Sequence, residues 1–142
     1  MTAPQIRPPD RMEAGQLFEL VRDFATSFTA DRSAFEQSLE TLLGDSGCDL
    51  LCAYDDSEIT GYILAFRHLS FFANGPVAWV EELYVRPEFR RRGIAAALMR
   101  EVESRARQHG VRLVALATRR ADEFYRAIGY EASATYYRRV LN

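Results

Sequence analysis

Lysine is absent from this sequence, because all 18 of its basic residues are arginine. Enzymes that work through a lysine Schiff base or another catalytic lysine are therefore excluded. Long apolar runs are also absent, and no stretch reaches the ~18 consecutive apolar residues of a transmembrane helix. The first ten residues lack the apolar core of a signal peptide. By default, we expect a cytoplasmic protein with no membrane partner.

Cysteine and histidine are scarce, with two of each in the chain. Cys48 and Cys52 fall in or beside one predicted strand, where residues four positions apart are separated by roughly 13 Å. That separation exceeds the ~7 Å Cα distance that a disulfide can bridge. Two cysteines and two histidines at these positions form no zinc pattern either. We therefore expect buried thiols and no metal site.

The overall charge is small, at −2, so no global basic footprint points to nucleic acid as a partner. The chain has 142 residues, of which 48% are hydrophobic and 12% aromatic. This length and composition predict one folded domain over residues 1–142, with a core of its own.

Hydrophobic periodicity and turn residues divide the chain into alternating helices and strands. In the first half, we expect a short strand around Ile6, a helix over 11–24, and a second helix that Asp31 or Ser33 caps and that ends at Gly44. Strands follow over 49–54, 59–68 and 78–85. In the second half, we expect a helix from about 93 to 109, a strand over 112–118, a short helix over 121–128, and one long or two short strands over 130–141. The strand, helix and strand over 78–118 predict a right-handed parallel crossover.

The most informative stretch is the turn that joins the strand over 78–85 to the next helix. It carries three arginines and then Gly93, which lets the backbone come close to a ligand. A helix N-terminus leaves about four backbone N–H groups without partners and carries positive charge, so a phosphate or pyrophosphate fits there. No Gly-Lys-Ser/Thr follows and no GxGxxG is present, so this is not a nucleotide P-loop. Taken alone, the turn fits an ordinary solvated basic turn equally well.

Two motifs in the second half of the chain together resemble the GNAT superfamily of acyl-CoA-dependent N-acyltransferases. The family signature Arg/Gln-x-x-Gly-x-Gly/Ala matches Arg90, Gly93 and Ala95. The second element, a short helix with Phe-Tyr that ends at Gly-aromatic, matches residues 124–125 and 129–130. The resemblance implies a mixed α/β fold: a central, twisted, mostly antiparallel sheet of about six to seven strands with about four helices, splayed between its two central parallel strands.

The resemblance also implies acetyl-CoA as the acyl-donor substrate and assigns residues to it. The CoA pyrophosphate would lie on the arginine-rich turn, at Arg90, Arg91, Arg92, Gly93, Ile94, Ala95 and Ala96. The pantetheine arm would pair with Leu83, Tyr84 and Val85 and pass Thr118, Arg119, Ala121 and Tyr125. Family members often have Asn where this chain has Thr118, so a side-chain contact to the arm does not carry over.

The chemistry of amine acetylation requires a base, because a protonated amine cannot attack a thioester. Glu81 and Glu82 are adjacent in a predicted strand, so we expect their side chains to face opposite ways and only one to face the acceptor. The resemblance favours Glu81 as the catalytic base and Tyr125 as the general acid that protonates the departing thiolate. The alternatives without a catalytic role are that Glu81 and Glu82 form salt bridges at the strand edge and that Tyr125 only packs against its neighbours.

The predicted function is therefore N-acetyltransferase activity that moves an acetyl group from acetyl-CoA directly to a primary amine of a small molecule in a ternary complex. A polyamine, an amino sugar or an amino acid would suit the acidic pair. The alternatives are a peptide or protein N-acetyltransferase and a non-catalytic acyl-CoA-binding regulatory module. We expect no nucleic-acid partner, although the three arginines also fit a DNA-binding turn, and the resemblance allows a homodimer. We look for acceptor contacts in residues 22–35, 66–76 and 130–138, with Arg67, His68, Tyr136 and Tyr137 as candidates.

Overall fold

A computed structural model describes residues 3–141 of the chain, and its elements follow the predicted order closely. The strands are β1 (Gln5–Arg7), β2 (Cys48–Asp55), β3 (Glu58–Ser70), β4 (Gly75–Val85) and β5 (Val114–Leu116). The helices are α1 (Ala14–Phe24), α2 (Arg32–Leu43), α3 (Ile94–Gln108) and α4 (Asp122–Ala127), with short 3₁₀ turns η1 (Arg11–Glu13) and η2 (Pro87–Phe89).

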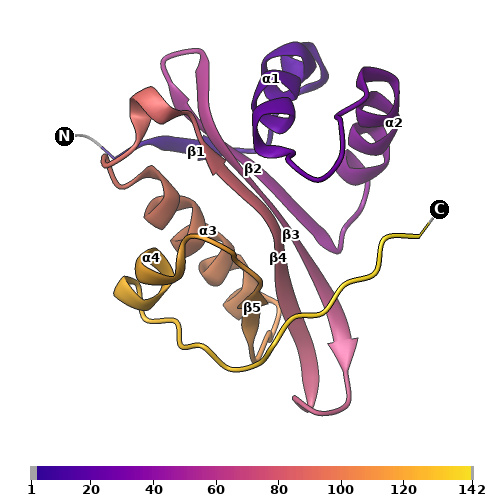
Figure 1. Cartoon of the computed structure of the whole chain (residues 1–142), viewed down its shortest axis with the longest axis vertical. Helices are drawn as coiled ribbons and strands as arrows, with labels where there is room; N and C mark the ends of the chain where they lie inside the picture. The colour runs from indigo at the N-terminus through magenta and orange to yellow at the C-terminus, as the bar shows by residue number, and fades with distance from the viewer. Residues whose placement is uncertain (1–2, 142) are drawn as a thin grey trace.

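One sheet in the order β1-β2-β3-β4-β5 forms the centre of the fold. The first three pairs are antiparallel, and β4 and β5 are parallel, as the crossover helix between them predicts. Helices α1 and α2 lie on one side of the sheet, and α3 and α4 lie on the other (Figure 1). The mixed, mostly antiparallel α/β fold is therefore confirmed, with five strands in the described chain instead of six to seven.

Each face of the sheet has its own hydrophobic core, because the strand side chains alternate between the two sides. Leu51, Ile63 and Leu98 belong to the core on the α3 side. Leu17 and Leu20 of α1 belong to the core on the α1 and α2 side. The two cores hold the strands rigidly from both faces, which fixes the backbone that borders the site.

Acidic residues cap the helical segments on the α1 and α2 side. Asp10 accepts a hydrogen bond from the backbone N–H of Met12, and Glu13 bonds back to the N–H of Asp10, which completes a capping box. Asp31 caps α2 through the N–H of Ala34, at 2.8 Å. Asp31 is therefore the cap of α2, one of the two residues expected there, whereas Asp10 caps η1 and the start of α1 has no side-chain cap.

The predicted final strand over residues 130–141 is wrong. The described part of this segment forms no strand, and most of it is exposed. Like residues stand next to each other in Tyr136-Tyr137-Arg138-Arg139, so the segment lacks the period-two alternation that a half-buried strand needs. Instead, it follows α4 and crosses toward the α1 and α2 side (Figure 1), where Arg138 donates a hydrogen bond to Ser27.

Both cysteines are free thiols in β2, as predicted, with Cys52 buried and Cys48 half-buried. Burial raises the pKa of Cys48 to about 11 and that of Cys52 to about 12, so neither is a reactive thiolate at neutral pH. Among the helices of residues 3–141, none combines the length and apolar character that a bilayer crossing requires.

Candidate active site

Strands β4 and β5 run together for only three residue pairs, from Ala78 with Val114 to Val80 with Leu116. Beyond Val80, β4 continues through Val85, whereas β5 ends at Leu116. The two parallel strands therefore part, which is the splay that the family resemblance implies. Along residues 81–85, the side of β4 that faces away from β3 pairs with no strand of the described chain. An extended ligand can pair with such a backbone as an added strand does.

The turn after β4 presents the backbone to an anion. Gly93 is the N-cap of α3 with φ 79°, a left-handed conformation that glycine adopts without strain. A Cβ atom built there meets no heavy atom within 4 Å, so the space above Gly93 is open. Ala97 N–H donates to Gly93 O at 3.0 Å, but the N–H groups of residues 91–96 have no acceptor in the described part of the chain. These free donors at a helix N-terminus fit a pyrophosphate.

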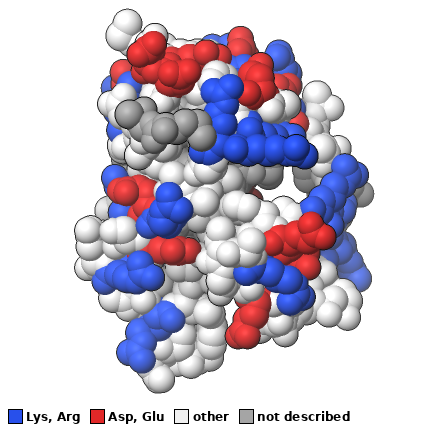
Figure 2. Space-filling view, turned by 90° about the vertical axis from the view of Figure 1, so that its left-hand side faces the viewer, with Lys and Arg blue, Asp and Glu red and all other residues white. Residues whose placement is uncertain are grey.

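The arginines of the turn connect it to the strand and leave positive charge at its surface. Arg90 donates from Nε to the carbonyl of Val85 at 2.9 Å, and its guanidinium lies 5.4 Å from the Tyr84 ring centre. The Arg92 guanidinium lies 5.0 Å from the Phe89 ring centre. Basic and acidic side chains are interspersed over the side of the molecule in Figure 2, so the positive charge there is local and not a continuous basic surface.

A large open cleft of about 2570 Å³ lies beside the splay, bounded by β4, β5, α1, α2, α4 and the C-terminal segment. The structure brings part of the predicted site together here, because the cleft is lined by Glu81, Glu82, Thr118, Arg119 and Tyr125. Tyr136, a candidate acceptor contact, also lines the cleft, whereas Arg67, His68 and Tyr137 do not. The other residues predicted to bind acetyl-CoA do not line it either. They continue along β4 and the turn, at Leu83, Tyr84, Val85, Arg90, Arg91, Arg92, Gly93, Ile94, Ala95 and Ala96, and Ala121 precedes α4.

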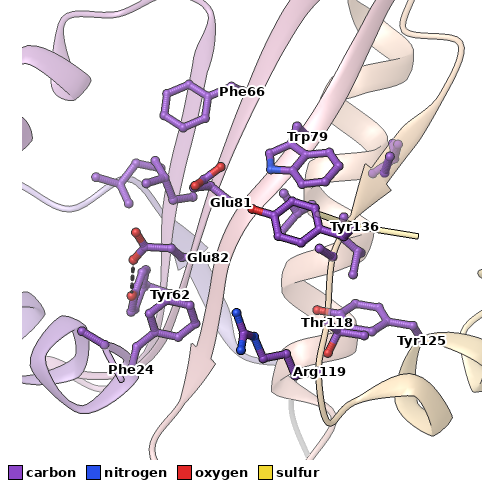
Figure 3. Close-up of a pocket in the computed structure, with 18 of the residues that line it drawn as sticks. Phe24, Tyr62, Phe66, Trp79, Glu81, Glu82, Thr118, Arg119, Tyr125 and Tyr136 are labelled. Atoms are coloured by element: carbon purple, nitrogen blue, oxygen red, sulfur yellow. Dashed lines mark hydrogen bonds between the residues drawn. The ribbon is translucent and has the colours of Figure 1, made fainter. Parts of the chain in front are cut away.

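A β-bulge in β4 overturns the expectation that Glu81 and Glu82 face opposite sides. Ala65 of β3 pairs with Val80 and Leu64 pairs with Glu82, so Glu81 is an extra residue without a partner of its own. A bulge of this kind resets the alternation of side chains along the strand. As a result, both carboxylates line the same cleft (Figure 3). No glycine or proline marks the bulge in the sequence, which is why the alternation rule failed here.

The two carboxylates differ in their surroundings. Glu81 is exposed, whereas Glu82 is half-buried and accepts a hydrogen bond from the hydroxyl of Tyr62 at 2.7 Å. Burial raises the pKa of Glu82, the Tyr62 hydrogen bond opposes that rise, and the charge of Glu81 adds to it. The environment of Glu82 therefore makes it more basic than an ordinary glutamate.

Tyr125 faces the cleft from α4, opposite the two glutamates (Figure 3). Its ring packs edge-on against Phe124 and Tyr130, with ring centres 4.9 and 5.9 Å away. Burial raises the pKa of Tyr125, so its hydroxyl keeps its proton at neutral pH. Thr118 uses its hydroxyl to accept the N–H of Ala121 at 3.1 Å, which orders the segment before α4.

Sequence reasoning missed Tyr62 and Trp79 in the cleft, whereas Phe24 and Phe66 fall within the ranges 22–35 and 66–76 that were expected to contact the acceptor. Phe24 and Tyr62 lie near Glu82, and Phe66 and Trp79 lie near Glu81 (Figure 3). Each occupies a position that also fits ordinary core packing. The pairing register of β3 and β4, such as Phe66 with Trp79, brings the strand aromatics together, and α1 adds Phe24. One sequence does not reveal that register.

Comparison with known proteins agrees with this geometry. Residues 15–130 match the family model described as "Acetyltransferase (GNAT) family". The chain belongs to this family. The splay and the Gly93 turn are thus parts of a GNAT fold, and acetyltransferases of the family use acetyl-CoA as the acetyl donor. The predicted family and donor are confirmed.

Among curated proteins, this GNAT chain is similar to "Aminoglycoside N(6')-acetyltransferase type 1" from Acinetobacter genomosp. 13. The two are 35% identical over 78 residues, which cover 52% of this chain and 53% of the relative. The match thus spans about half the length of each protein.

Solved structures share the GNAT fold over nearly the whole chain. An aminoglycoside antibiotic 6'-N-acetyltransferase from Acinetobacter haemolyticus matches with a TM-score of 0.79 and 21% identity, over 97% of this chain and 99% of its own. A "transcriptional regulator" from Bacillus halodurans C-125 matches with a TM-score of 0.90 and 20% identity, over 98% of this chain and 100% of its own.

Proposed function

We propose that this chain transfers an acetyl group from acetyl-CoA directly to a primary amine of a small cationic molecule, with both substrates bound at once. The observation that carries the proposal is the bulge in β4, which turns two carboxylates into one cleft at the edge of the splay. An anionic cleft attracts a protonated amine. The similarity to an aminoglycoside acetyltransferase over half the chain supports an amino sugar as the acceptor. A polyamine or an amino acid also carries the positive charge that the anionic cleft attracts.

The donor end of the site consists mainly of backbone. Acetyl-CoA supplies the acetyl thioester. The free N–H groups of residues 91–96 would bind its pyrophosphate, and the unpaired side of β4 over residues 81–85 would hold its pantetheine arm. Both contacts use rigid main chain, so they would place the thioester at the mouth of the cleft with little loss of flexibility.

In the proposed transfer, Glu82 acts as the base and Tyr125 as the acid. The amine gives a proton to the Glu82 carboxylate, its nitrogen forms the bond to the acetyl carbon, and the bond from that carbon to sulfur breaks. The Tyr125 hydroxyl donates its proton to the departing thiolate, and the resulting tyrosinate takes the remaining proton from the acetylated nitrogen. The raised pKa of Glu82 supports its role as the base in place of Glu81, because a more basic carboxylate takes the proton more readily at neutral pH.

Glu81 would serve the acceptor in a different way. It is exposed and lies near Phe66 and Trp79 (Figure 3). A carboxylate next to aromatic rings attracts an organic cation through both charge and cation–π contact. We infer that Glu81 holds a positively charged part of the acceptor while a neighbouring amine reacts at Glu82.

The direct test is the release of CoA thiol from acetyl-CoA over a panel of polyamines, amino sugars, amino acids and short peptides. We expect turnover with at least one multiply charged small amine. Turnover with peptides alone would support a peptide N-acetyltransferase instead. Tight acetyl-CoA binding by calorimetry without turnover of any amine would support a non-catalytic acyl-CoA-binding module and would overturn the proposal.

A further inference from the structure

We propose that Tyr62 is the positioning residue for Glu82, because its hydroxyl holds one carboxylate oxygen and directs the other toward the acceptor amine. This inference rests on the proposed function and adds to it the group that orients the base. Tyr62 belongs to none of the motifs in the sequence. Its role follows from how β3 and β4 pair.

The geometry gives Tyr62 a fixed position. It is 1% exposed, its backbone pairs with Tyr84 across β3 and β4, and its ring meets Phe24 edge-on with centres 6.3 Å apart. Its hydroxyl reaches Glu82 Oε1 at 2.7 Å. Within residues 3–141, Glu82 Oε2 has no hydrogen-bond partner, so it is the oxygen available to a substrate. A buried ring fixed on two sides is a rigid support for a carboxylate.

A second hydrogen bond from a tyrosine hydroxyl to a glutamate occurs in this chain, between Tyr54 and Glu13. On β2, Tyr54 donates to Glu13 at 2.7 Å, but Glu13 is also paired with Arg7 at 2.9 Å. The Arg7 hydrogen bond is the main reason that the pKa of Glu13 falls to about 2. Buried Asp49 likewise has Arg67 beside it.

Glu82 differs from these structural carboxylates, because it has the tyrosine without an arginine. No ion pair to Glu82 occurs among residues 3–141. The groups around it are Tyr62 from β3, Glu81 from β4 and Phe24 at the end of α1, with Arg119 across the cleft (Figure 3). An arginine partner would hold Glu82 permanently ionised and unable to accept a proton. A tyrosine without an arginine orients the carboxylate and leaves it able to accept a proton.

Removal of the Tyr62 hydroxyl therefore has a defined consequence. Burial and Glu81 both favour the protonated form of Glu82, and the Tyr62 hydrogen bond favours the carboxylate. Without that bond, Glu82 stays protonated to higher pH. Burial raises the pKa of Tyr62 itself, so the tyrosine remains a donor throughout the range of an enzyme assay.

The experiment compares Tyr62→Phe with Tyr54→Phe. Both changes remove one hydroxyl from a buried ring that bonds to a glutamate at 2.7 Å, so both should cost similar stability. For Tyr62→Phe, we expect the acid limb of the kcat/KM profile to move to higher pH, with a loss of roughly tenfold at the acid end and little change in acetyl-CoA affinity. We expect Tyr54→Phe to keep the wild-type profile. Profiles that shift equally, or not at all, would overturn the inference.

A second measurement separates this inference from the proposed function. The carboxyl carbon of Glu82, labelled with ¹³C and assigned by its loss in Glu82→Gln, can be titrated by NMR in the full chain without any substrate. We expect it to titrate at higher pH in Tyr62→Phe, and an unchanged titration overturns the inference even if the enzyme is active. If the wild type acetylates no amine, the proposed function fails, but the titration still decides whether Tyr62 controls Glu82. Should Tyr62→Phe not fold, 3-fluorotyrosine at residue 62 makes a stronger donor, and Glu82 should then titrate at lower pH.

Discussion

Trp79 and Tyr136 stack with their ring centres 6.3 Å apart and their planes inclined by 22°. One ring belongs to β4 and the other to the C-terminal segment, so the end of the chain supplies part of the cleft wall. Trp79 is the single tryptophan of the protein, and it therefore reports on this contact by its fluorescence.

We expect Tyr136→Ala to weaken acceptor binding, because the substitution removes one wall of the cleft. An aromatic contact contributes roughly 0.5–1.5 kcal/mol, which predicts a rise of about 2- to 10-fold in the acceptor KM. The kcat and the acetyl-CoA KM should stay unchanged, and the Trp79 emission should shift to the red. Tyr137→Ala is the matched control, because Tyr137 is 86% exposed and does not line the cleft. Equal effects of the two variants would contradict this role of Tyr136.

Gly93→Val should reduce acetyl-CoA affinity by about tenfold or more, since the new side chain occupies the space over the free N–H groups. Gly110 provides the control at the other end of α3. Its φ of 73° is close to the 79° of Gly93, and a Cβ at either position meets nothing within 4 Å. Both variants should therefore lose about 1–2 kcal/mol of stability from the left-handed backbone. Calorimetry should find lower affinity for the Gly93 variant alone, and intact affinity there would refute the pyrophosphate assignment.

Tyr125→Phe should lower kcat by about tenfold or more while acetyl-CoA affinity remains, because only the proton donor is lost. The sign of the pH dependence follows from the burial that raises the pKa of Tyr125. The protonated form is the active one, so the wild-type rate should fall only above the ordinary tyrosine value of about 10. Tyr130→Phe is the control, because that ring packs against Tyr125 but its hydroxyl donates to Glu103 at 2.6 Å. A Tyr125→Phe enzyme with normal kcat would exclude the acid role.

Substitutions of Glu81 and Glu82 should affect different kinetic parameters. Glu82→Gln should lower kcat for every amine, because the base is lost. Glu81→Gln should leave kcat nearly intact and raise KM more for a diamine than for a monoamine of the same length. Steady-state kinetics on such a matched pair of amines makes the comparison. A fall in kcat for Glu81→Gln alone would restore Glu81 as the base.

The parts of the site that are local in sequence were predictable. The Gly93 turn, the α3 helix and the position of Tyr125 depend on residues close together in the chain, and caps and glycines mark them directly. The expected helix over 11–24 shows the limit of such signals, because Met12 falls in a 3₁₀ turn and is 96% exposed.

The parts that depend on strand register were not predictable. The bulge at Glu81 exists because β3 and β4 pair with one residue to spare, and both strands look regular on their own. The contact of Tyr62 with Glu82 joins residues 20 positions apart through that same register. In the sequence, the close approach of β3 to β4 is marked by Gly61, where a Cβ would lie 2.9 Å from the carbonyl oxygen of Tyr84.

The end of the β4 and β5 pairing at Val80 also affects how fast the protein is degraded. Along residues 81–85, one side of β4 pairs with no strand of the described chain, and a donor that paired with it would complete the sheet. A ligand that binds only the folded form stabilises it by mass action, by about 2.7 kcal/mol at a concentration 100 times its Kd. The free chain should therefore open and be cleaved by proteases more often than the loaded one. Its abundance would then follow the supply of its own donor.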